Sequence, residues 1–579
     1  MIHATGSQII VKLLEMEGVK TVAGIPGGSI LPLYDELNRS SIKHILVRHE
    51  QAAGFIAQGM ARSTGIPAVC MATSGPGAMN LLTAIADARC DSVPIVAITG
   101  QVNTSLIGTD AFQEADTFGL SFPITKHSMM VKNAADLLTA IPKAFAIAVS
   151  GRPGPVLIDV PRDVQTAVVE FESWPSIKTI QEDKHSSLAL RFSTPKEQIP
   201  SVVSQMAETL LSAKKPVLYA GGGCNTKEAF VEISKFLSSY TCAVVTSLMG
   251  IGAVSKKAAN NFGMVGMHGS YAANRAMHDA DVVLAAGVRF DDRATGVISK
   301  FCPNAKILHI DIDAAEINKI LPSYSSLVCD VESAFPLITA KLAGASSDFA
   351  GDRAEWVSDL KKIFDETESV ELGRSKDIAP ASVNPRAFIK SIPEYAEKAG
   401  CSAQNIIVTT DVGQHQMWSA QYYPVEYARQ FLTSGSLGTM GFGLPTAVGV
   451  SLANEGKRVV CISGDGSILM NIQELATLSE LDLDVTVIVL QNGSLGMVRQ
   501  QQEYLFKKNY SASIFEKVPD FLSIAKGFDI DAIDANADSE WYKKAFAKGS
   551  HVVRLNIAMA ENVLPFVSAG NANIDAIRN

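Results

Sequence analysis

The chain has 579 residues, of which 47% are hydrophobic and 19% charged, and its formal net charge is −9. At roughly 150 residues per domain, this length indicates about three or four domains. The acidic balance gives no reason to expect nucleic acid as a partner, because nucleic-acid-binding proteins carry basic faces. No apolar run is long enough to span a bilayer, so we expect no membrane association.

The N-terminal segment "MIHATGSQIIVKLLEMEGVK" lacks the basic start, apolar core and cleavage site of a signal peptide. We expect it to form the first amphipathic helix of the fold. The eight cysteines are scattered, without a CxxC pair or a Cys/His cluster. This usage is typical of reduced thiols and argues against a zinc site, so a cytoplasmic location is expected.

Apolar, β-branched runs alternate with segments of helical periodicity along most of the chain. Such runs are typical of parallel strands that helices cover on both faces. The sequence therefore predicts an α/β protein of three doubly wound parallel-sheet domains. Runs of this kind, each holding a predicted strand, include residues 67–73, 94–100, 154–160, 215–223, 281–288, 305–313, 405–413, 458–466 and 484–492.

Two segments interrupt this alternation and are interpreted as linkers. Residues 165–200 are polar, and residues 342–385 mix Gly, Ser and Pro with charged residues. We expect the second segment to hold a helix. The first and third domains could be two copies of one fold, although no sequence repeat shows it. The predicted domains are 1–165, 190–340 and 375–560, with linkers at 166–189 and 341–374 and a C-terminal tail at 561–579.

Asp465 and Asn492 each follow a predicted strand, and a helical stripe over residues 468–478 lies between those strands. Ligands bind outside the carboxyl ends of such strands, so the two side chains are expected to converge. The glycines on either side of Asp465 let backbone N–H groups approach an anion. A carboxylate, an amide oxygen and a phosphate-cradling turn make a hard oxygen site of the kind that Mg²⁺ prefers. The alternative is a tight turn at "GDG" and a capping role for Asn492.

"GDG" followed at a distance by Asn resembles the fingerprint of thiamine diphosphate enzymes, in which Mg²⁺ bridges the protein and the cofactor's diphosphate. The resemblance implies that Asp465 and Asn492 are side-chain ligands of Mg²⁺ and that Ser494 supplies a backbone carbonyl. Such enzymes also need a buried carboxylic acid beside the cofactor's pyrimidine ring. "HILVRHEQAAGF" offers Glu50 between a strand at 44–48 and a helix. Taken alone, Glu50 would be a helix-start residue favoured by the helix dipole.

Several longer stretches, in their joint order over nearly the whole chain, resemble the catalytic subunits of acetolactate synthases (acetohydroxyacid synthases). They are "GIPGGSILPLYDEL", "RHEQAAGFIAQGMAR", "SGPGAMN", "IGTDAFQEADTFGLSFPITKH", "SGRPGPVLIDVPRDVQ", "GVRFDDRATG", "TTDVGQHQMW", "SGSLGTMGFGLP" and "GDGSILMNIQE". The resemblance implies a transferase that decarboxylates pyruvate and joins the hydroxyethyl unit to a second pyruvate or to 2-ketobutyrate. That reaction is the first common step of branched-chain amino-acid (isoleucine and valine) biosynthesis.

The resemblance also implies a homodimer or a dimer of dimers with active sites between subunits, and a possible separate small regulatory subunit. The domains at 1–165 and 375–560 would bind the pyrimidine and the diphosphate with Mg²⁺. Gly27, Glu50 and Gln113 would be catalytic, and Phe112, Arg162, Val498 and Gln501 would contact substrate. Thiamine diphosphate would be held by Pro76, Asn80, Val412, Gly413, Gln414, His415, Gly438, Met440, Gly464, Gly466, Ser467 and Met497.

The middle domain ends one predicted strand in glycines ("PVLYAGGG") and another in acids ("ILHIDID"). A glycine turn with an acid is dinucleotide-binding chemistry, but the spacing does not fit GxGxxG, and ordinary loop chemistry is the alternative. "RFDDR" resembles the FAD-binding stretch of the family. The resemblance implies a structural FAD without a redox role, held by Arg152, Gly222, Arg289, Asp311 and Asp330.

Three positions depart from the family pattern. Arg162 stands where Lys is usual, and the two cations are not interchangeable; Met79 stands where Thr is usual. Gln501 stands where many members carry a Trp that favours 2-ketobutyrate as second substrate. We therefore predict weaker discrimination between acceptors and weak binding of herbicides that contact this Trp.

Three other functions remain open at this stage. A pyruvate oxidase would use the same layout with redox-active FAD, although "RFDDR" and "GTDAFQE" argue against it. A carboligase for another 2-ketoacid, such as glyoxylate, shares the scaffold, but Glu50 disfavours the glyoxylate type. A non-catalytic subunit would have no need of Glu50, Gln113, Asp465 and Asn492 together.

Overall fold

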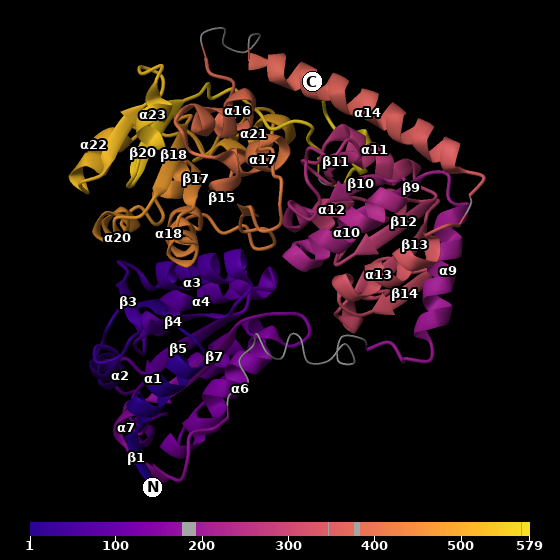
Figure 1. Ribbon diagram of the computed structural model, residues 1–579. Helices are drawn as coiled ribbons and strands as arrows, with labels where there is room; N and C mark the ends of the chain where they lie inside the picture. Colours follow the sequence, from indigo (N-terminus) through magenta and orange to yellow (C-terminus); the bar gives the residue numbers. More distant parts are fainter. Residues whose placement is uncertain (177–192, 346, 376–381, 569, 579) are drawn as a thin grey trace.

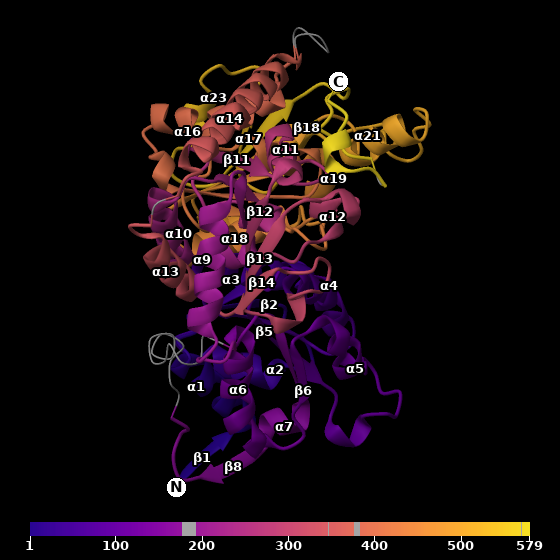
Figure 2. The same cartoon turned by 90° about the vertical axis from the view of Figure 1, so that its right-hand side faces the viewer.

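The computed structural model describes residues 1–176, 193–345, 347–375, 382–568 and 570–578. This part of the chain holds three six-stranded parallel sheets covered by helices and one two-stranded sheet (Figure 1). The first sheet lies at the N-terminal end of the molecule, and the other two lie together at the opposite end in both views (Figures 1 and 2). The predicted α/β fold class is confirmed.

The first sheet has the order β3-β2-β4-β5-β7-β6. Its strands are β2 (Thr21–Gly24), β3 (Lys43–Leu46), β4 (Ala68–Ala72), β5 (Ile95–Gln101), β6 (His127–Met130) and β7 (Val156–Pro161). Successive strand residues point to opposite faces, so Val22 packs under α1 (Gly6–Met16) and α6 (Leu137–Val149). Ala23 faces α3 (Glu50–Thr64) and α4 (Pro76–Cys90) on the other side.

The third sheet repeats this topology, with the order β16-β15-β17-β18-β20-β19. Its strands are β15 (Ile406–Thr410), β16 (Phe431–Leu432), β17 (Arg458–Gly464), β18 (Val485–Gln491), β19 (Asp531–Asp534) and β20 (His551–Asn556). Its helices are α16 (Pro385–Lys398), α17 (Gln414–Tyr422), α18 (Gly443–Ala453), α20 (Glu474–Leu481), α21 (Gly496–Leu505), α22 (Phe521–Gly527) and α23 (Trp541–Ala545). In chain order within its own domain, each sheet places its second strand at one edge and its fifth strand at the other. This agrees with the hypothesis of two copies of one fold.

The middle sheet has a different order, β11-β10-β9-β12-β13-β14. Its strands are β9 (Pro216–Ala220), β10 (Ala243–Thr246), β11 (Asn261–Met264), β12 (Val282–Ala286), β13 (Lys306–Asp311) and β14 (Ser325–Val328). The chain reverses direction across the sheet between β9 and β12, as in dinucleotide-binding folds, where the ligand lies at that reversal. Its helices are α9 (Ile199–Ser212), α10 (Lys227–Ser239), α11 (Tyr271–Asp279) and α13 (Val331–Leu342).

All the strands predicted above are present, including the one at 44–48, and three other predictions need correction. The N-terminal segment begins with strand β1 (Ile2–Thr5), and only then enters α1. The first predicted linker contains β8 (Val168–Phe171), which pairs antiparallel with β1. The helical stripe after Asp465 is broken into α19 (Asp465–Ile468) and α20, because Asn471 turns its amide to Gly441 O and Gln51 Oε1. The second linker does hold a helix, α14 (Ala350–Gly373).

The first and third domains share a core within one chain. Helices α3 and α18 cross where Gly59 meets Thr446 and Gly449 meets Ile56 (Figure 1). A Cβ at Gly449 would lie 2.0 Å from Ile56 O, and one at Gly59 would lie 2.3 Å from Thr446 O. Only glycine lets the two backbones approach this closely.

Two predictions from composition can be compared with the described ranges. In them, no helix is both long and apolar enough to cross a membrane. All eight cysteines fall in these ranges and are free.

Candidate active site

A solvent-open pocket of about 450 Å³ lies at the carboxyl ends of β15, β17 and β18. This is the edge at which a doubly wound sheet binds its ligand. Most of the residues predicted to hold the diphosphate and Mg²⁺ line it, together with two of the predicted residues of α21: Val412, Gly413, Gln414, His415, Met440, Gly464, Asp465, Gly466, Ser467, Asn492, Ser494, Met497 and Val498. Gly438 lies just outside, beside Val412.

Asp465 and Asn492 converge as predicted, because β17 and β18 are direct neighbours in the sheet. Asp465 Oδ2 accepts hydrogen bonds from Asn492 N at 3.0 Å and Gly493 N at 2.6 Å. Burial raises the pKa of Asp465 to about 6. A cation bound here would favour the ionised carboxylate and offset that burial.

The donor set fits Mg²⁺ bound together with a phosphate. Asn492 lines the pocket, and its Oδ1 accepts hydrogen bonds from Ser494 N and Ser494 Oγ, each at 3.0 Å. Across the described ranges, no three His, Cys, Asp or Glu side chains cluster as a metal site. One carboxylate and one amide leave most of an octahedron empty, which matches a cation that completes its coordination with ligand phosphates and water.

The part of the pocket formed by the start of α17 and His415 is suited to an anion. Helix α17 begins at Gln414, and its N-cap Gly413 offers no side chain to the free N–H groups of the first turn. His415 is buried, its Nε2 has no partner among the described residues, and burial lowers its pKa to about 3. A Cβ at Gly464 would lie 2.7 Å from His415 Nδ1, so glycine is required there.

A second cluster of predicted residues lies in the first domain. Asn80 Nδ2 donates to Glu50 Oε2 at 2.8 Å, and Glu50 opens α3 half-buried. A Cβ at Gly27 would lie 2.5 Å from Thr73 Cβ, and Pro76 begins the neighbouring helix α4. This cluster follows the strand ends of the first sheet, and none of its residues lines the diphosphate pocket of the same chain.

Phe112 and Gln113 lie on a loop beside this cluster. Gln113 has a φ of +59° and packs over Gly75. Phe112 is 87% exposed, and Leu106, Leu120 and Phe122 on the same segment are also exposed. An apolar stretch of this kind, left open in a single chain, is typical of an interface.

Of the four predicted substrate residues only Val498 lines the pocket; Phe112, Arg162 and Gln501 lie outside it. Arg162 is exposed at the start of the short helix α7 (Arg162–Thr166). Gln501 lies one turn along α21 from Met497 and Val498, which line the pocket.

Three of the predicted FAD residues, Gly222, Arg289 and Asp311, lie at the carboxyl ends of β9, β12 and β13, at or next to the chain reversal of the middle sheet. The loops after β9 and β12 touch there, since a Cβ at Gly221 would lie 2.0 Å from Gly287 O. Asp311 ends β13, and burial raises its pKa to about 6. Gly222 lies in the turn after β9, beside Met249, and Asp330 is the N-cap of α13.

The two arginines predicted to bind FAD already have protein partners. Arg152 Nη1 lies 2.7 Å from Glu316 Oε1 and 3.4 Å from Asp313 Oδ2. Arg289 Nη1 donates to Cys90 O at 2.7 Å, and its Nη2 donates to Ser436 Oγ. The glycine loops and the topology fit a dinucleotide, and these arginines join the middle domain to its neighbours.

Sequence reasoning missed Asp411, which ties the pocket loops together. This buried carboxylate accepts from Val412 N at 2.9 Å, Gly441 N at 2.8 Å and Ser463 Oγ at 3.2 Å. Its place at the end of β15, before the predicted Val412–His415 stretch, was the available signal.

A second pocket, of about 510 Å³, was also missed. It is lined by Asp292 and Arg293 of "RFDDR", by Met267, and by the C-terminal residues Val567 and Asn571. The sequence interpretation had assigned "RFDDR" to FAD alone, and the C-terminal side of this pocket could not be seen from spacing.

Three domain models of thiamine pyrophosphate enzymes match the chain: the N-terminal TPP binding domain over residues 4–120, the central domain over 203–338 and the C-terminal TPP binding domain over 411–554. The fold and the pocket therefore belong to a thiamine diphosphate enzyme.

Full-length relatives narrow this class. The chain is 45% identical to acetolactate synthase isozyme 1 large subunit of Escherichia coli, over 99% of this chain and 97% of the relative. It is 40% identical to isozyme 2 large subunit of the same organism, over 99% of each chain, and 40% identical to a probable acetolactate synthase large subunit of Methanocaldococcus jannaschii, over 98% and 94%. The chain belongs to the acetolactate synthase large-subunit family.

Proposed function

We propose that this chain is the catalytic subunit of an acetolactate synthase that depends on thiamine diphosphate and Mg²⁺. It decarboxylates pyruvate and condenses the two-carbon unit with a second pyruvate or with 2-ketobutyrate, the first common step of branched-chain amino-acid biosynthesis. The observation that carries the proposal is the Asp465–Asn492 pair in a glycine-lined pocket, in a chain that matches large subunits from end to end.

The chain's own residues would divide the work as follows. Asp465, Asn492 and the Ser494 carbonyl hold Mg²⁺, while His415 and the N–H groups at the start of α17 hold the diphosphate. Thiamine diphosphate, when bound, would supply the carbon nucleophile for the decarboxylation of pyruvate. Glu50 binds the pyrimidine ring and exchanges a proton with it, with Oε2 held by Asn80.

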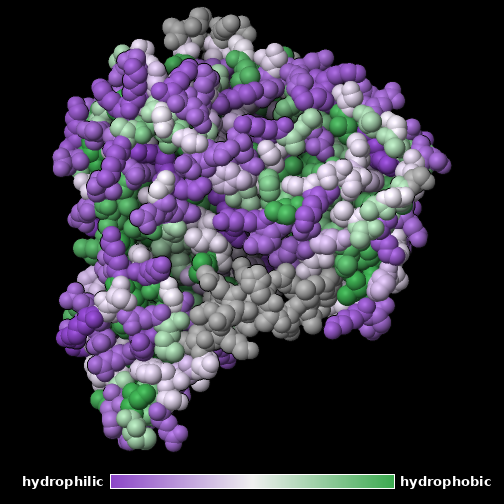
Figure 3. Space-filling model, viewed as in Figure 1, coloured by the Kyte–Doolittle hydropathy of each residue, from purple (hydrophilic) through white to green (hydrophobic). Residues whose placement is uncertain are grey.

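The complete site would need two copies of the chain. The diphosphate pocket is lined by third-domain residues alone, and Glu50 lies in the first domain outside that pocket. Apolar side chains also gather on one side of the surface at the level where the first and third domains meet (Figure 3). Among the exposed apolar residues, Leu46 belongs to the first domain and Met470 to the third, and Phe112 of the first domain is 87% exposed. These features support a homodimer, or a dimer of dimers, with active sites between subunits.

Several finer assignments belong to the same proposal. A structural FAD binds at the β9/β12 reversal, and a separate small regulatory subunit pairs with this chain, as the name "large subunit" of its relatives suggests. The eight free thiols are consistent with a cytoplasmic protein. Gln501 on α21 leaves the enzyme less biased toward 2-ketobutyrate.

The test is product analysis by NMR after anaerobic incubation with pyruvate, Mg²⁺, thiamine diphosphate and FAD. We expect acetolactate from the parent chain and a loss of at least about a hundredfold in Glu50→Gln, since proton transfer by a positioned acid contributes about that much. Acetaldehyde, acetate or no product would overturn the proposal and return the enzyme to the wider thiamine diphosphate class.

A further inference from the structure

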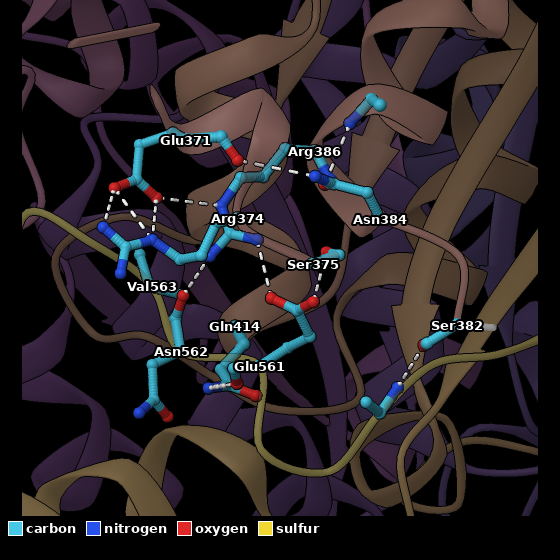
Figure 4. A network of polar contacts seen from close by, with 12 residues as sticks. Glu371, Arg374, Ser375, Ser382, Asn384, Arg386, Gln414, Glu561, Asn562 and Val563 are labelled. Atoms are coloured by element: carbon cyan, nitrogen blue, oxygen red, sulfur yellow. Dashed lines mark hydrogen bonds and ion pairs between the residues drawn. The ribbon is translucent and has the colours of Figure 1, made fainter. Parts of the chain in front are cut away.

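A chain of side-chain amides joins the predicted metal ligand Asn492 to the C-terminal segment Glu561–Val563. That segment follows the third sheet and was predicted to begin a tail, yet Glu561 and Val563 are fully buried. Figure 4 shows Gln414 in contact with Glu561, beside the charged side chains of Glu371, Arg374 and Arg386. The proposed function gives no reason for these contacts.

The amide of Gln500 has its orientation fixed by the backbone. Its Oε1 accepts from Val563 N at 2.7 Å, and its Nε2 donates to Val563 O at 2.9 Å. A backbone N–H can only donate and a carbonyl can only accept, so the two ends of this amide cannot exchange. Gln500 is fully buried, which makes an unpaired donor or acceptor there costly.

Gln500 in turn fixes Gln414. Gln414 Nε2 donates to Gln500 Oε1 at 3.0 Å and to Glu561 O at 2.9 Å. Its Oε1 must therefore face the other way, where it accepts from Asn492 Nδ2 at 3.2 Å. A Cβ at Gly496 would lie 2.1 Å from Gln414 Oε1, so the glycine makes room for this contact.

The last link concerns Asn492. With Nδ2 directed to Gln414, its Oδ1 lies on the side of Ser494. Only the oxygen of an amide can ligate a cation, and a flipped amide would present two hydrogens instead. We infer that Gln414 and Gln500 are positioning residues that present Asn492 Oδ1 to the divalent cation. The inference rests on the proposed metal site.

The C-terminal segment, at the other end of this chain of amides, is itself held in place by a buried arginine. Arg386 is fully buried and donates from Nη1 to Glu561 Oε2 at 2.7 Å and from Nη2 to Asn562 O at 2.5 Å (Figure 4). Its Nε lies 3.2 Å from Glu371 Oε2 at the end of α14. Breaking a buried ion pair leaves an uncompensated charge, so this clamp holds the segment firmly. The orientation of a metal ligand is thereby set by the C-terminal segment.

The test is Mn²⁺ binding measured by electron paramagnetic resonance at saturating thiamine diphosphate, on the FAD-loaded full chain. Gln500→Met keeps the side-chain length and removes both hydrogen-bonding ends. We expect it to weaken Mn²⁺ binding about tenfold, as loss of an orienting partner does at other metal sites. Gln502→Met on the same helix is the matched control, because its amide contacts Ser511 and Ser513 instead, and its affinity should stay at the parent value.

Asn492→Asp separates orientation from general structural damage. A carboxylate offers oxygen on both sides, so it needs no orienting partner. Adding Gln500→Met to Asn492→Asp should then weaken Mn²⁺ binding by less than about twofold, a non-additive result. An equal tenfold loss in both backgrounds, or no loss in either, would overturn the inference. Gln500→Asn, too short to reach Val563 and Gln414 together, replaces the Met variant if that one does not fold.

The two proposals fail differently. If the parent chain binds no Mn²⁺ with thiamine diphosphate, the proposed function fails. If the parent binds Mn²⁺ and the Gln500→Met variant binds it equally well, only the inference about Gln414 and Gln500 fails.

Discussion

The backbone N–H of Asn492 lies 3.0 Å from Oδ2 of Asp465, although 26 residues separate the two positions. The contact exists because β17 and β18 are adjacent parallel strands whose carboxyl ends meet at one edge of the third sheet. Asp465 is thus held in place before any cation binds. The sheet edge therefore positions the proposed cofactor site. The contact with Gln414 in addition sets the orientation of Asn492, the second proposed metal ligand.

Asp159 predicts a pH dependence of stability. It is buried in β7, accepts from Thr99 Oγ1 and Gln101 Nε2, and burial raises its pKa to about 7. The folded chain then keeps a proton that the unfolded chain releases above the ordinary Asp pKa, so this group's contribution to stability falls as pH rises from about 4 to about 7.

At about 1.4 kcal/mol per pH unit, the full effect is on the order of 4 kcal/mol. Urea unfolding at several pH values should show a flatter profile for Asp159→Asn than for the parent. The exposed Asp348→Asn is the control and should leave the slope unchanged. Parallel profiles for all three proteins would contradict the assignment.

The close crossing of α3 and α18 predicts that adding one methyl group at Gly449 strongly destabilises the fold. Gly449→Ala would place Cβ 2.0 Å from Ile56 O, against backbone that cannot move aside. We expect a loss of at least about 3 kcal/mol in unfolding free energy, at the upper end of overpacking effects. Gly351→Ala in α14 meets nothing within 4 Å and should be neutral or slightly stabilising. Equal melting temperatures for the two variants would rule out this close packing.

The strands could be predicted from the sequence because buried parallel strands are continuous β-branched runs bounded by glycine and acids. The convergence of Asp465 and Asn492 followed from that pattern alone. The break between α19 and α20 could not be predicted, since the apolar stripe continues through it and the cause is the contact of Asn471 with Gly441 and Gln51. Local periodicity carries no information on such long-range contacts.

The C-terminal segment is a second case in which long-range contacts could not be predicted from local periodicity. Residues 561–579 are predicted to form a tail, yet the structure buries Glu561 and Val563 at its start. Their contacts are with Arg386 and Gln500, which are distant in the sequence. The exposed face around Phe112 is likewise not explained by contacts within one chain, and the second copy that we propose would cover it.

Gln501 predicts the choice of second substrate. Replacing it with Trp adds a large apolar surface to α21, one turn from Val498. We expect Gln501→Trp to raise the preference for 2-ketobutyrate over pyruvate roughly tenfold, the scale of an added apolar contact in a substrate pocket. Competition assays that quantify both products measure the ratio directly. A parent enzyme that already prefers 2-ketobutyrate strongly, or an unchanged ratio in the variant, would contradict the role of this position.

If FAD has only a structural role, the flavin should not change its oxidation state during turnover. Adding pyruvate to the FAD-loaded enzyme without oxygen should leave the visible flavin absorption unchanged while acetolactate accumulates. The Arg152→Ala variant, which loses the contacts to Glu316 and Asp313, should bind FAD more weakly. Bleaching of the flavin by pyruvate would indicate an oxidase instead.

In the proposed dimer, each active site combines Glu50 of one chain with Asp465 of another. A hybrid dimer of Glu50→Gln and Asp465→Asn chains, co-expressed with different tags and purified through both, tests it directly. One of its two sites would hold both intact residues, so we predict about half of the parent activity, although each variant alone is inactive. A hybrid as inactive as its two components would contradict the claim and place the whole site within one chain.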